Sequence, residues 1–213
     1  MKSDKFKNMS RRELAEYVWD YYKVHIIAGL AILFVLGSLL NTLVLNPAKK
    51  GYISVVVYGE HVPNESISAL EELLTDVIVP SELRSGWKIA VDNFYMDDYN
   101  PMASMALAQK FAALLMSGEL DILIASLDVF DEMLFDGMFL PLDGIMPDRW
   151  ASMSIMGTTD EEPSLKVYGV NITGSSVLEA CGLIIDRPAV GIIVSSKQWK
   201  TAIDGINILV PDR

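Results

Sequence analysis

An uncharged apolar run near the N-terminus constrains this chain more than any other feature. Residues 26–45 read IIAGLAILFVLGSLLNTLVL and contain no charged residue. A helix of about 20 apolar residues matches the ~30 Å hydrocarbon core of a bilayer. A buried helix of a soluble protein usually keeps a polar stripe, and a cleaved signal peptide has a shorter apolar region of roughly 7–15 residues. We therefore predict a transmembrane helix over residues 25–45 that stays in the protein as an uncleaved anchor.

The residues that flank this run predict its orientation. Six Lys and Arg precede the run, whereas only Lys49 and Lys50 follow it closely. The more basic flank stays in the cytoplasm, so residues 1–24 are expected to form a cytoplasmic helix and the rest of the chain to lie outside. Ser10 and Glu13 have the spacing of a capping box for that helix. Four aromatic residues are predicted to sit at the membrane interface: Tyr17, Trp19, Tyr21 and Tyr22.

The charge of the chain divides at the same place. The first 25 residues hold six Lys/Arg and four Asp/Glu, a net charge of +2. The remainder holds eleven Lys/Arg and 24 Asp/Glu, a net charge of −13. An acidic domain lacks the basic surface that nucleic-acid phosphates require, and it is repelled by an anionic bilayer surface. We expect no nucleic-acid partner and assign the acidic charge to solubility.

Residues 46–51 are predicted to form a stalk and residues 52–213 one extracytoplasmic α/β domain. Strand patterns alternate with helix patterns, and the strands are apolar on both faces, which is typical of a mainly parallel, mixed sheet covered by helices. A capping box at Ser68 and Glu71 predicts the first helix of the domain. Strands are expected near residues 53–58, 87–92, 120–125, 164–169 and 189–194, helices near 68–77, 102–116, 126–137, 175–180 and 197–208, and irregular chain over 144–163.

The sequence offers little catalytic chemistry. It has no glycine-rich dinucleotide motif, no phosphate loop, no His-Glu-x-x-His and no Gly-x-Ser-x-Gly. His25 and His61 are the only histidines, which leaves no cluster for zinc. The single cysteine, Cys181, lies among apolar residues and is expected to be a small buried hydrophobe. We therefore expect no enzyme activity, no cofactor and no metal site.

Neighbouring carboxylates are the remaining candidates. Asp97 and Asp98 follow a predicted strand, and with Tyr95 and Tyr99 they suit a cation or sugar site. The favoured interpretation is a polar loop that leads into the next helix. The acidic run 160–162 lacks the spacing of a calcium loop and is interpreted as a solvated loop.

Two segments of the outer domain resemble a known family. The first runs Gly118-Glu-Leu-Asp-Ile-Leu-Ile-Ala125, continues through Val129, Phe130 and Gly137, and ends in Phe139-Leu-Pro-Leu-Asp143. The second is 187–197, RPAVGIIVSSK. Both resemble bacterial extracellular solute-binding proteins of the periplasmic-binding-protein type II class, over residues 51–145 and 185–208. The resemblance implies one lobe of that class.

The resemblance also implies where a ligand would bind. In such lobes the ligand meets the carboxyl ends of the strands, which here implies Tyr58, Glu60, Asp97, Ser126 and Asp128. Each has a structural alternative, and Ser126 is also the expected N-cap of a helix. The chain departs from the class because its outer part has room for one lobe, and because a transmembrane helix replaces a lipidated cysteine.

Three functions follow as hypotheses. The leading one is a non-catalytic, membrane-tethered, solute-binding-protein-like domain that binds a small solute or a partner membrane protein. The second is a structural accessory subunit of a membrane complex, which docks through the transmembrane helix and its aromatic flank. The third is a hydrolase that uses Asp97 and Asp98.

Overall fold

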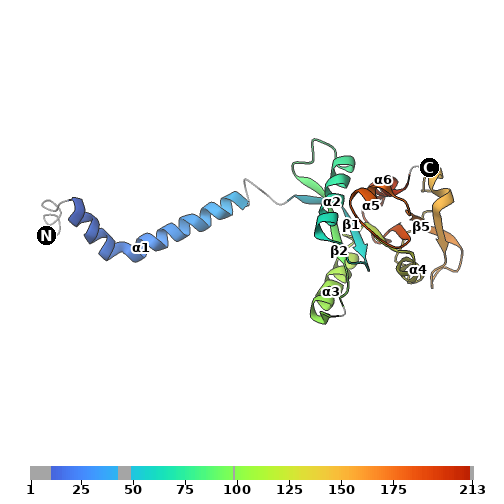
Figure 1. Ribbon diagram of the computed structural model, residues 1–213, viewed down its shortest axis with the longest axis horizontal. Coiled ribbons are helices and arrows are strands. Elements are labelled where there is room, and N and C mark those ends of the chain that lie inside the picture. Colours follow the sequence, from blue (N-terminus) through green and yellow to red (C-terminus); the bar gives the residue numbers. More distant parts are fainter. Residues whose placement is uncertain (1–10, 43–48, 98, 212–213) are drawn as a thin grey trace. The chain divides into compact units, whose positions relative to one another are not determined.

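The computed structural model describes residues 11–42, 49–97 and 99–211 (Figure 1). The chain divides into two compact units, Met1–Ala48 and Lys49–Arg213. The boundary falls within the predicted stalk, so the division into an N-terminal helical segment and one α/β domain agrees with the sequence.

The first unit contains one long helix, α1 (Arg11–Leu40). Its segment Tyr22–Leu40 is long and apolar enough to cross a membrane, and none of that segment is buried within the protein. Trp19 and Tyr22 are exposed, as side chains at a membrane interface would be. Three further predictions, the Ser10 cap and the side chains of Tyr17 and Tyr21, lie outside the described residues.

The second unit is built on a mixed sheet. Among its described residues, six strands lie in the order β2-β1-β3-β6-β5-β4. The strands are β1 (Lys50–Tyr58), β2 (Trp87–Phe94), β3 (Ile122–Ser126), β4 (Ser154–Gly157), β5 (Lys166–Asn171) and β6 (Pro188–Ile192). The helices are α2 (Asn64–Ile78), α3 (Pro101–Ser117), α4 (Leu127–Phe135), α5 (Ser176–Ala180) and α6 (Trp199–Leu209), with a 3-10 turn η2 over Asp148–Met153.

The sheet is parallel in one half only. Strand β1 pairs in parallel with β2 and with β3. Strands β6, β5 and β4 then add to β3 in antiparallel fashion. The predicted mixed α/β sheet is confirmed, but "mainly parallel" is wrong for the β6-β5-β4 half. Strand β3 of the parallel half and strand β6 of the antiparallel half are both buried on their two faces, so burial alone does not report strand direction.

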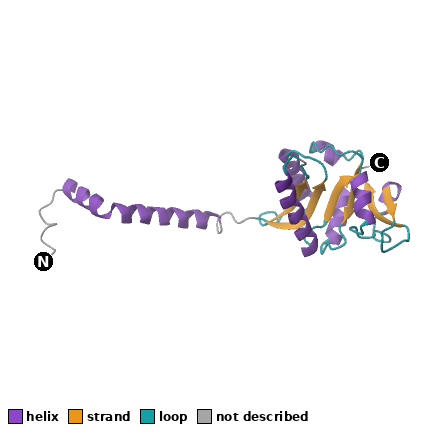
Figure 2. Ribbon diagram, turned by 90° about the horizontal axis from the view of Figure 1, so that it is seen from below, coloured by secondary structure: helices purple, strands orange, loops and turns teal. Residues whose placement is uncertain are grey.

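Helices cover both faces of the sheet (Figure 2). Strand β2 lies on one side of β1 and β3 on the other, so right-handed connections place α2 and α3 on opposite faces. The first face packs with α2, α5 and α6, and the second with α3 and α4. Side chains along β1 alternate accordingly: Val55 and Val57 face the first core, and Val56 faces the second.

Two glycines provide space for the aromatic centre of the second core. Phe130 and Phe139 stack with ring centroids 4.1 Å apart. They lie over Gly169 and Gly191, which are opposite each other in the β5–β6 pairing. A Cβ at Gly191 would lie 2.7 Å from Phe139, so side chains at these positions would displace the rings.

The boundaries of two elements differ from the prediction. Lys50 and Gly51, predicted as stalk, already belong to β1, where Lys50 pairs with Trp87 and its amine lies 5.6 Å from the indole centre. Helix α2 begins at Asn64 after Pro63, one turn before the predicted cap Ser68. The sequence pattern of a helix cap can also occur within a helix. Here Ser68 lies within α2, one turn after its start, and is exposed to solvent.

The segment 144–163 contains structure that the sequence pattern missed. It holds the η2 turn and the edge strand β4, where irregular chain was predicted. Strand β4 has only four residues and none is buried, so it lacks a readable apolar pattern. By contrast, α3 and α5 lie close to the predicted 102–116 and 175–180, with Gly118 as the left-handed C-cap of α3 and Ser175 as the N-cap of α5.

Candidate functional site

The carboxyl ends of β1, β2 and β3 form one edge of the sheet, where the resemblance places a ligand. This edge is completed by β6, which begins at Pro188 opposite Ser126. The two segments that carry the family resemblance are therefore neighbours in the sheet. Tyr58 and Ser126, at the ends of β1 and β3, both lie at this edge.

Tyr58 and Glu60 are held by contacts that stabilise the fold. The Tyr58 ring is half-buried and lies 5.0 Å from the ring of Phe111 on α3. The chain turns after Tyr58 at Gly59, which has a φ of 88°. The Asn93 side-chain amide donates to the carbonyls of Val57 and Glu60 at 3.1 and 2.8 Å. This hydrogen-bonded turn fixes the backbone at Glu60, which is half-buried.

Ser126 and Asp128 lie at the start of α4. Ser126 occupies the N-cap position, as predicted, but its hydroxyl makes no capping hydrogen bond. The Arg187 guanidinium donates to both oxygens of Asp128, at 2.9 and 3.0 Å. The carboxylate raises the pKa of Arg187. The Arg187 carbonyl also accepts from the Leu127 amide, so Arg187 connects the start of β6 to the start of α4.

Asp97 belongs to a different local structure. Its carboxylate accepts from the Tyr99 amide at 2.9 Å, and its backbone exchanges two hydrogen bonds with the Ser104 hydroxyl. Asn100 caps α3 through the Ala103 amide. This arrangement is the predicted polar loop into the helix. Asp98 lies outside the described residues, so the carboxylate pair is not available as a described site.

Arg187 and Asn93 are the two edge residues that sequence reasoning missed. Asn93 lies one residue beyond the predicted strand, and its role depends on the turn that follows the neighbouring strand β1. Arg187 has a φ of 43°, rare for a residue with a side chain. The Arg-Pro dipeptide gave a hint of unusual backbone, since the residue before proline is restricted.

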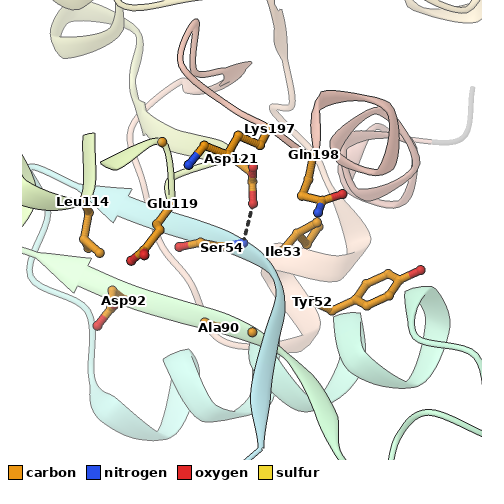
Figure 3. Close-up of a pocket in the computed structure, with 12 residues that line it drawn as sticks. Tyr52, Ile53, Ser54, Ala90, Asp92, Leu114, Glu119, Asp121, Lys197 and Gln198 are labelled. Atoms are coloured by element: carbon orange, nitrogen blue, oxygen red, sulfur yellow. Dashed lines mark hydrogen bonds between the residues drawn. The ribbon is translucent and has the colours of Figure 1, made fainter. Parts of the chain in front are cut away.

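A hollow of about 440 Å³ opens at the opposite edge, beside the amino end of β1 (Figure 3). The buried Asp121 carboxylate accepts from the Ser54 amide at 2.9 Å and from the Ser196 hydroxyl at 2.5 Å. The Lys197 amine donates to the Ser117 carbonyl at 2.8 Å. The polar groups that line this hollow thus stabilise the junction of β1, β3 and α3. We therefore assign the hollow a structural role.

A hollow of about 720 Å³ lies beside β5 and includes the acidic run 160–162. Glu162 accepts from the Ser164 hydroxyl at 2.7 Å and from the Lys166 amine at 3.0 Å. These hydrogen bonds, that of Ser164 first, lower the pKa of Glu162 to about 2. Within the described residues, no group of three or more Asp, Glu, His and Cys is placed to hold a metal ion.

Cys181 matches its predicted role. It is buried at 7% exposure in the first core. Burial raises the pKa of its thiol, which keeps it protonated and unreactive at neutral pH.

The outer face of α3 is an uncharged, largely apolar surface. Phe111 is the helix's only buried residue among those described, and Leu107 and Leu114 pack beside it. The opposite face carries an uncharged stripe of seven exposed residues, which we call the α3 stripe: Met102, Met105, Ala106, Gln109, Ala112, Ala113 and Met116. The three methionines are 85%, 63% and 87% exposed, respectively.

The single charge on α3 lies beside the stripe and points away from it. The Lys110 amine forms a 2.6 Å ion pair with Asp92 on β2 and lies 5.3 Å from the centre of the Phe94 ring. Solvent-exposed helix faces of soluble domains normally carry charged and polar residues. A methionine-rich, charge-free face is instead typical of surfaces that contact other molecules.

No family model, no curated protein and no solved structure matches the chain.

Proposed function

We propose that this chain is a non-catalytic, membrane-tethered binding domain of solute-binding-protein-like architecture, which contacts a protein partner outside the membrane. The length and hydropathy of Tyr22–Leu40 support an anchor. Five cations before that segment, together with Lys23 at its start, support a cytoplasmic N-terminus. The acidic α/β domain then lies on the extracytoplasmic side.

The architecture favours surface contact over capture of a solute between two lobes. The described residues of the domain form one sheet with two covering layers, and no second sheet faces the carboxyl edge. Enclosing a solute would need a second lobe to close against this edge. The observation that carries the proposal is the α3 stripe, which leaves three methionines exposed on a helix already docked by its other face.

The chemistry of the stripe favours a protein over lipid. Helices that lie in a bilayer surface carry Lys and Arg on their polar side and bulky Trp, Phe or Leu on the other. Helix α3 has only Lys110, which is paired with Asp92, and the domain is acidic overall. The partner surface is therefore an uncharged, apolar face of a protein.

Site-specific photocrosslinking in native membranes tests this proposal. A photoreactive residue at Met105, within the stripe, is expected to give a protein adduct. The same residue at Glu72, exposed on α2, is the control and is expected to give none. Adding Ala112→Glu should abolish the Met105 adduct, because it buries a charge in the contact. Equal adducts at both positions, or none at Met105, would refute protein contact through this face.

A small-ligand function at the carboxyl edge is the second candidate. The Ser126 hydroxyl lies at the start of α4 without a capping bond, next to the Arg187–Asp128 pair. Thermal-shift screening of the detergent-solubilised chain against sugars, peptides and divalent cations tests it. A ligand that raises the melting temperature of the wild type but not of Ser126→Ala would support it. No shift with any class would reject it.

A structural accessory subunit remains the alternative form of a protein-binding role. In that case α1 itself, with Trp19 and Tyr22 exposed beside the apolar segment, would contact other membrane helices. Photoreactive residues at these two positions would then give protein adducts, whereas adducts confined to Met105 would reject docking through the aromatic flank.

A further inference from the structure

The α3 stripe has an internal symmetry centred on Gln109. Its other members lie three, four and seven residues before and after Gln109, so they occupy one face of the helix on both sides of it. The outer positions, Met102 and Met116, are both methionine. The positions three residues away, Ala106 and Ala112, are both alanine. Such a face can meet a copy of itself across a two-fold axis.

We propose that the partner of the α3 stripe is a second copy of this chain, bound through antiparallel α3 helices on a two-fold axis at Gln109. This rests on the proposed protein-binding function and names its partner. Residue sizes are complementary in this arrangement. Met105 lies across from the partner's Ala113, so on each side of the axis a long side chain meets a short one.

The alanines allow close approach at the centre. Ala106 of each copy lies across from the partner's Ala112, where no long side chain keeps the helices apart. Packed helices lie about 8–10 Å apart, and small residues favour the lower value. With Cα atoms at a radius of about 2.3 Å, the two facing Cα atoms of Gln109 then approach to about 3–5 Å.

The one polar side chain of the stripe also pairs with itself. The Gln109 amide has both a donor NH₂ and an acceptor oxygen. Two such amides on a two-fold axis can exchange hydrogen bonds, which pairs the oxygen and one N–H donor of each Gln109 side chain. An antiparallel pair also places the positive start of each helix beside the negative end of the other.

The expected interface is small, and the membrane tether compensates for its size. One helix pair buries less than the roughly 1,200 Å² that characterises stable interfaces. Only residues 43–48 separate the described ends of the two units, and six residues span at most about 20 Å. If α1 is anchored in the membrane, each domain is confined to a thin layer, where the local concentration of copies is high.

The acidic charge of the domain predicts an unusual salt dependence. Two copies repel each other through their net negative charge, while the α3 stripe itself carries no charge to be screened. Salt shortens the reach of the repulsion to about 8 Å at physiological ionic strength. Dimer formation should therefore increase with salt, and a decrease would contradict the proposed interface.

Disulfide crosslinking of the full chain in membranes tests contact at the axis. Gln109→Cys is expected to give an oxidised dimer in high yield, because facing Cα atoms lie within the ~7 Å that a disulfide needs. The wild type, whose only thiol is the buried Cys181, sets the background. Glu72→Cys on α2 controls for random collision. A Gln109→Cys yield no higher than that of Glu72→Cys would overturn the proposal.

The register and direction of the helices have their own test. Met102→Cys and Met116→Cys should not dimerise alone, because each lies about 20 Å from its own copy across the axis. Mixed in one membrane, the two variants should crosslink to each other. Dimerisation of either variant alone would indicate parallel helices and overturn the antiparallel arrangement.

The two proposals fail in different ways. If the Met105 photoadduct has a mass other than twice that of the chain, and Gln109→Cys gives only background, the partner is a different protein. The protein-binding function then stands and self-association is wrong. If Met105 gives no adduct at all, both are wrong.

Discussion

Helices α2 and α3 pack on opposite faces of the same parallel strands, yet their outer faces differ. The outer face of α2 carries Glu65, Ser68, Glu72 and Asp76, all exposed. The outer face of α3 carries the uncharged stripe around Gln109. Both helices bury an apolar side against the sheet, so docking to the core does not explain the difference.

The two outer faces suit different surroundings. Charges on α2 add solubility and cost the fold little. The stripe on α3 adds nothing to the core and exposes apolar surface, which is unfavourable unless another molecule covers it. The following predictions test whether the two helices are alike in their packing and different only on their outer faces.

The largest expected effects on stability come from truncating the buried side chains that pack α2 and α3 against the sheet. Phe111→Ala should lower the free energy of unfolding by about 3–5 kcal/mol, since it removes the main contact of α3 with the sheet. Leu70→Ala on α2 should cost about 2–5 kcal/mol. Urea denaturation of the detergent-solubilised chain, followed by tryptophan fluorescence, measures both. A cost below about 1 kcal/mol for Phe111→Ala would mean that α3 is not docked as described.

A buried hydrogen bond distinguishes α2 on its inner side. The Thr75 hydroxyl accepts from the Ile89 amide of β2 at 2.9 Å. Thr75→Val keeps the shape and leaves that amide without its partner, so the unfolding free energy should fall by about 1–3 kcal/mol. Thr75→Ser, which keeps the hydroxyl, is the matched control in the same urea titration. Equal losses for the two variants would assign the effect to packing.

A third outer surface, just before β5, can be compared with the outer faces of α2 and α3, because its contribution to stability is expected to depend on pH. Hydrogen bonds hold the pKa of Glu162 at about 2, below its ordinary 4.5. The ionised Glu162 therefore contributes fully to the stability of the fold at pH values above its ordinary pKa. This contribution is lost as the pH falls through the pKa that Glu162 has in the folded protein. In urea denaturation, Glu162→Gln should have a lower unfolding midpoint than the wild type at about pH 6. The midpoints of the two proteins should converge at about pH 2. A constant difference would refute this.

The smallest effects on stability are expected on the outer faces themselves. Met105→Lys on α3 and Ser68→Lys on α2 should each change the unfolding free energy by less than about 0.5 kcal/mol. Only Met105→Lys should reduce the Gln109→Cys dimer to background, since it places a charge in the contact. Equal dimer yields in both variants would remove the distinction between the two faces.

Most of the fold could be predicted from the sequence, because apolar runs and turn residues mark the elements. The strands around Val56 and Leu123 are continuous apolar runs, and Gly118 marks the end of α3. Strand β4 could not be predicted, since an exposed edge strand of four residues has no such pattern. The early start of α2 was missed because the Ser68 and Glu71 spacing imitates a helix start.

The candidate sites were predicted less well than the fold. Tyr58, Ser126 and Asp128 do lie at the carboxyl edge, but Asp97 stabilises its own loop. The pairing of Asp128 with Arg187 was missed, because 59 residues separate them and only the antiparallel return of β6 brings them together. The predictions of ligand binding, of no enzyme activity and of membrane orientation stay predictions.

The sequence by itself determined the long apolar helix, the acidic α/β domain and the order of most elements, because local hydrophobic patterns report burial directly. The tertiary structure decided how α3 divides its many apolar residues. The helical periodicity predicts a core face with Ala103, Leu107, Phe111 and Leu114, and the last three do pack in the second core, but the methionines make the other face apolar as well. Only docking of Phe111 against Tyr58 and Phe94 turns the methionines outward and creates the α3 stripe.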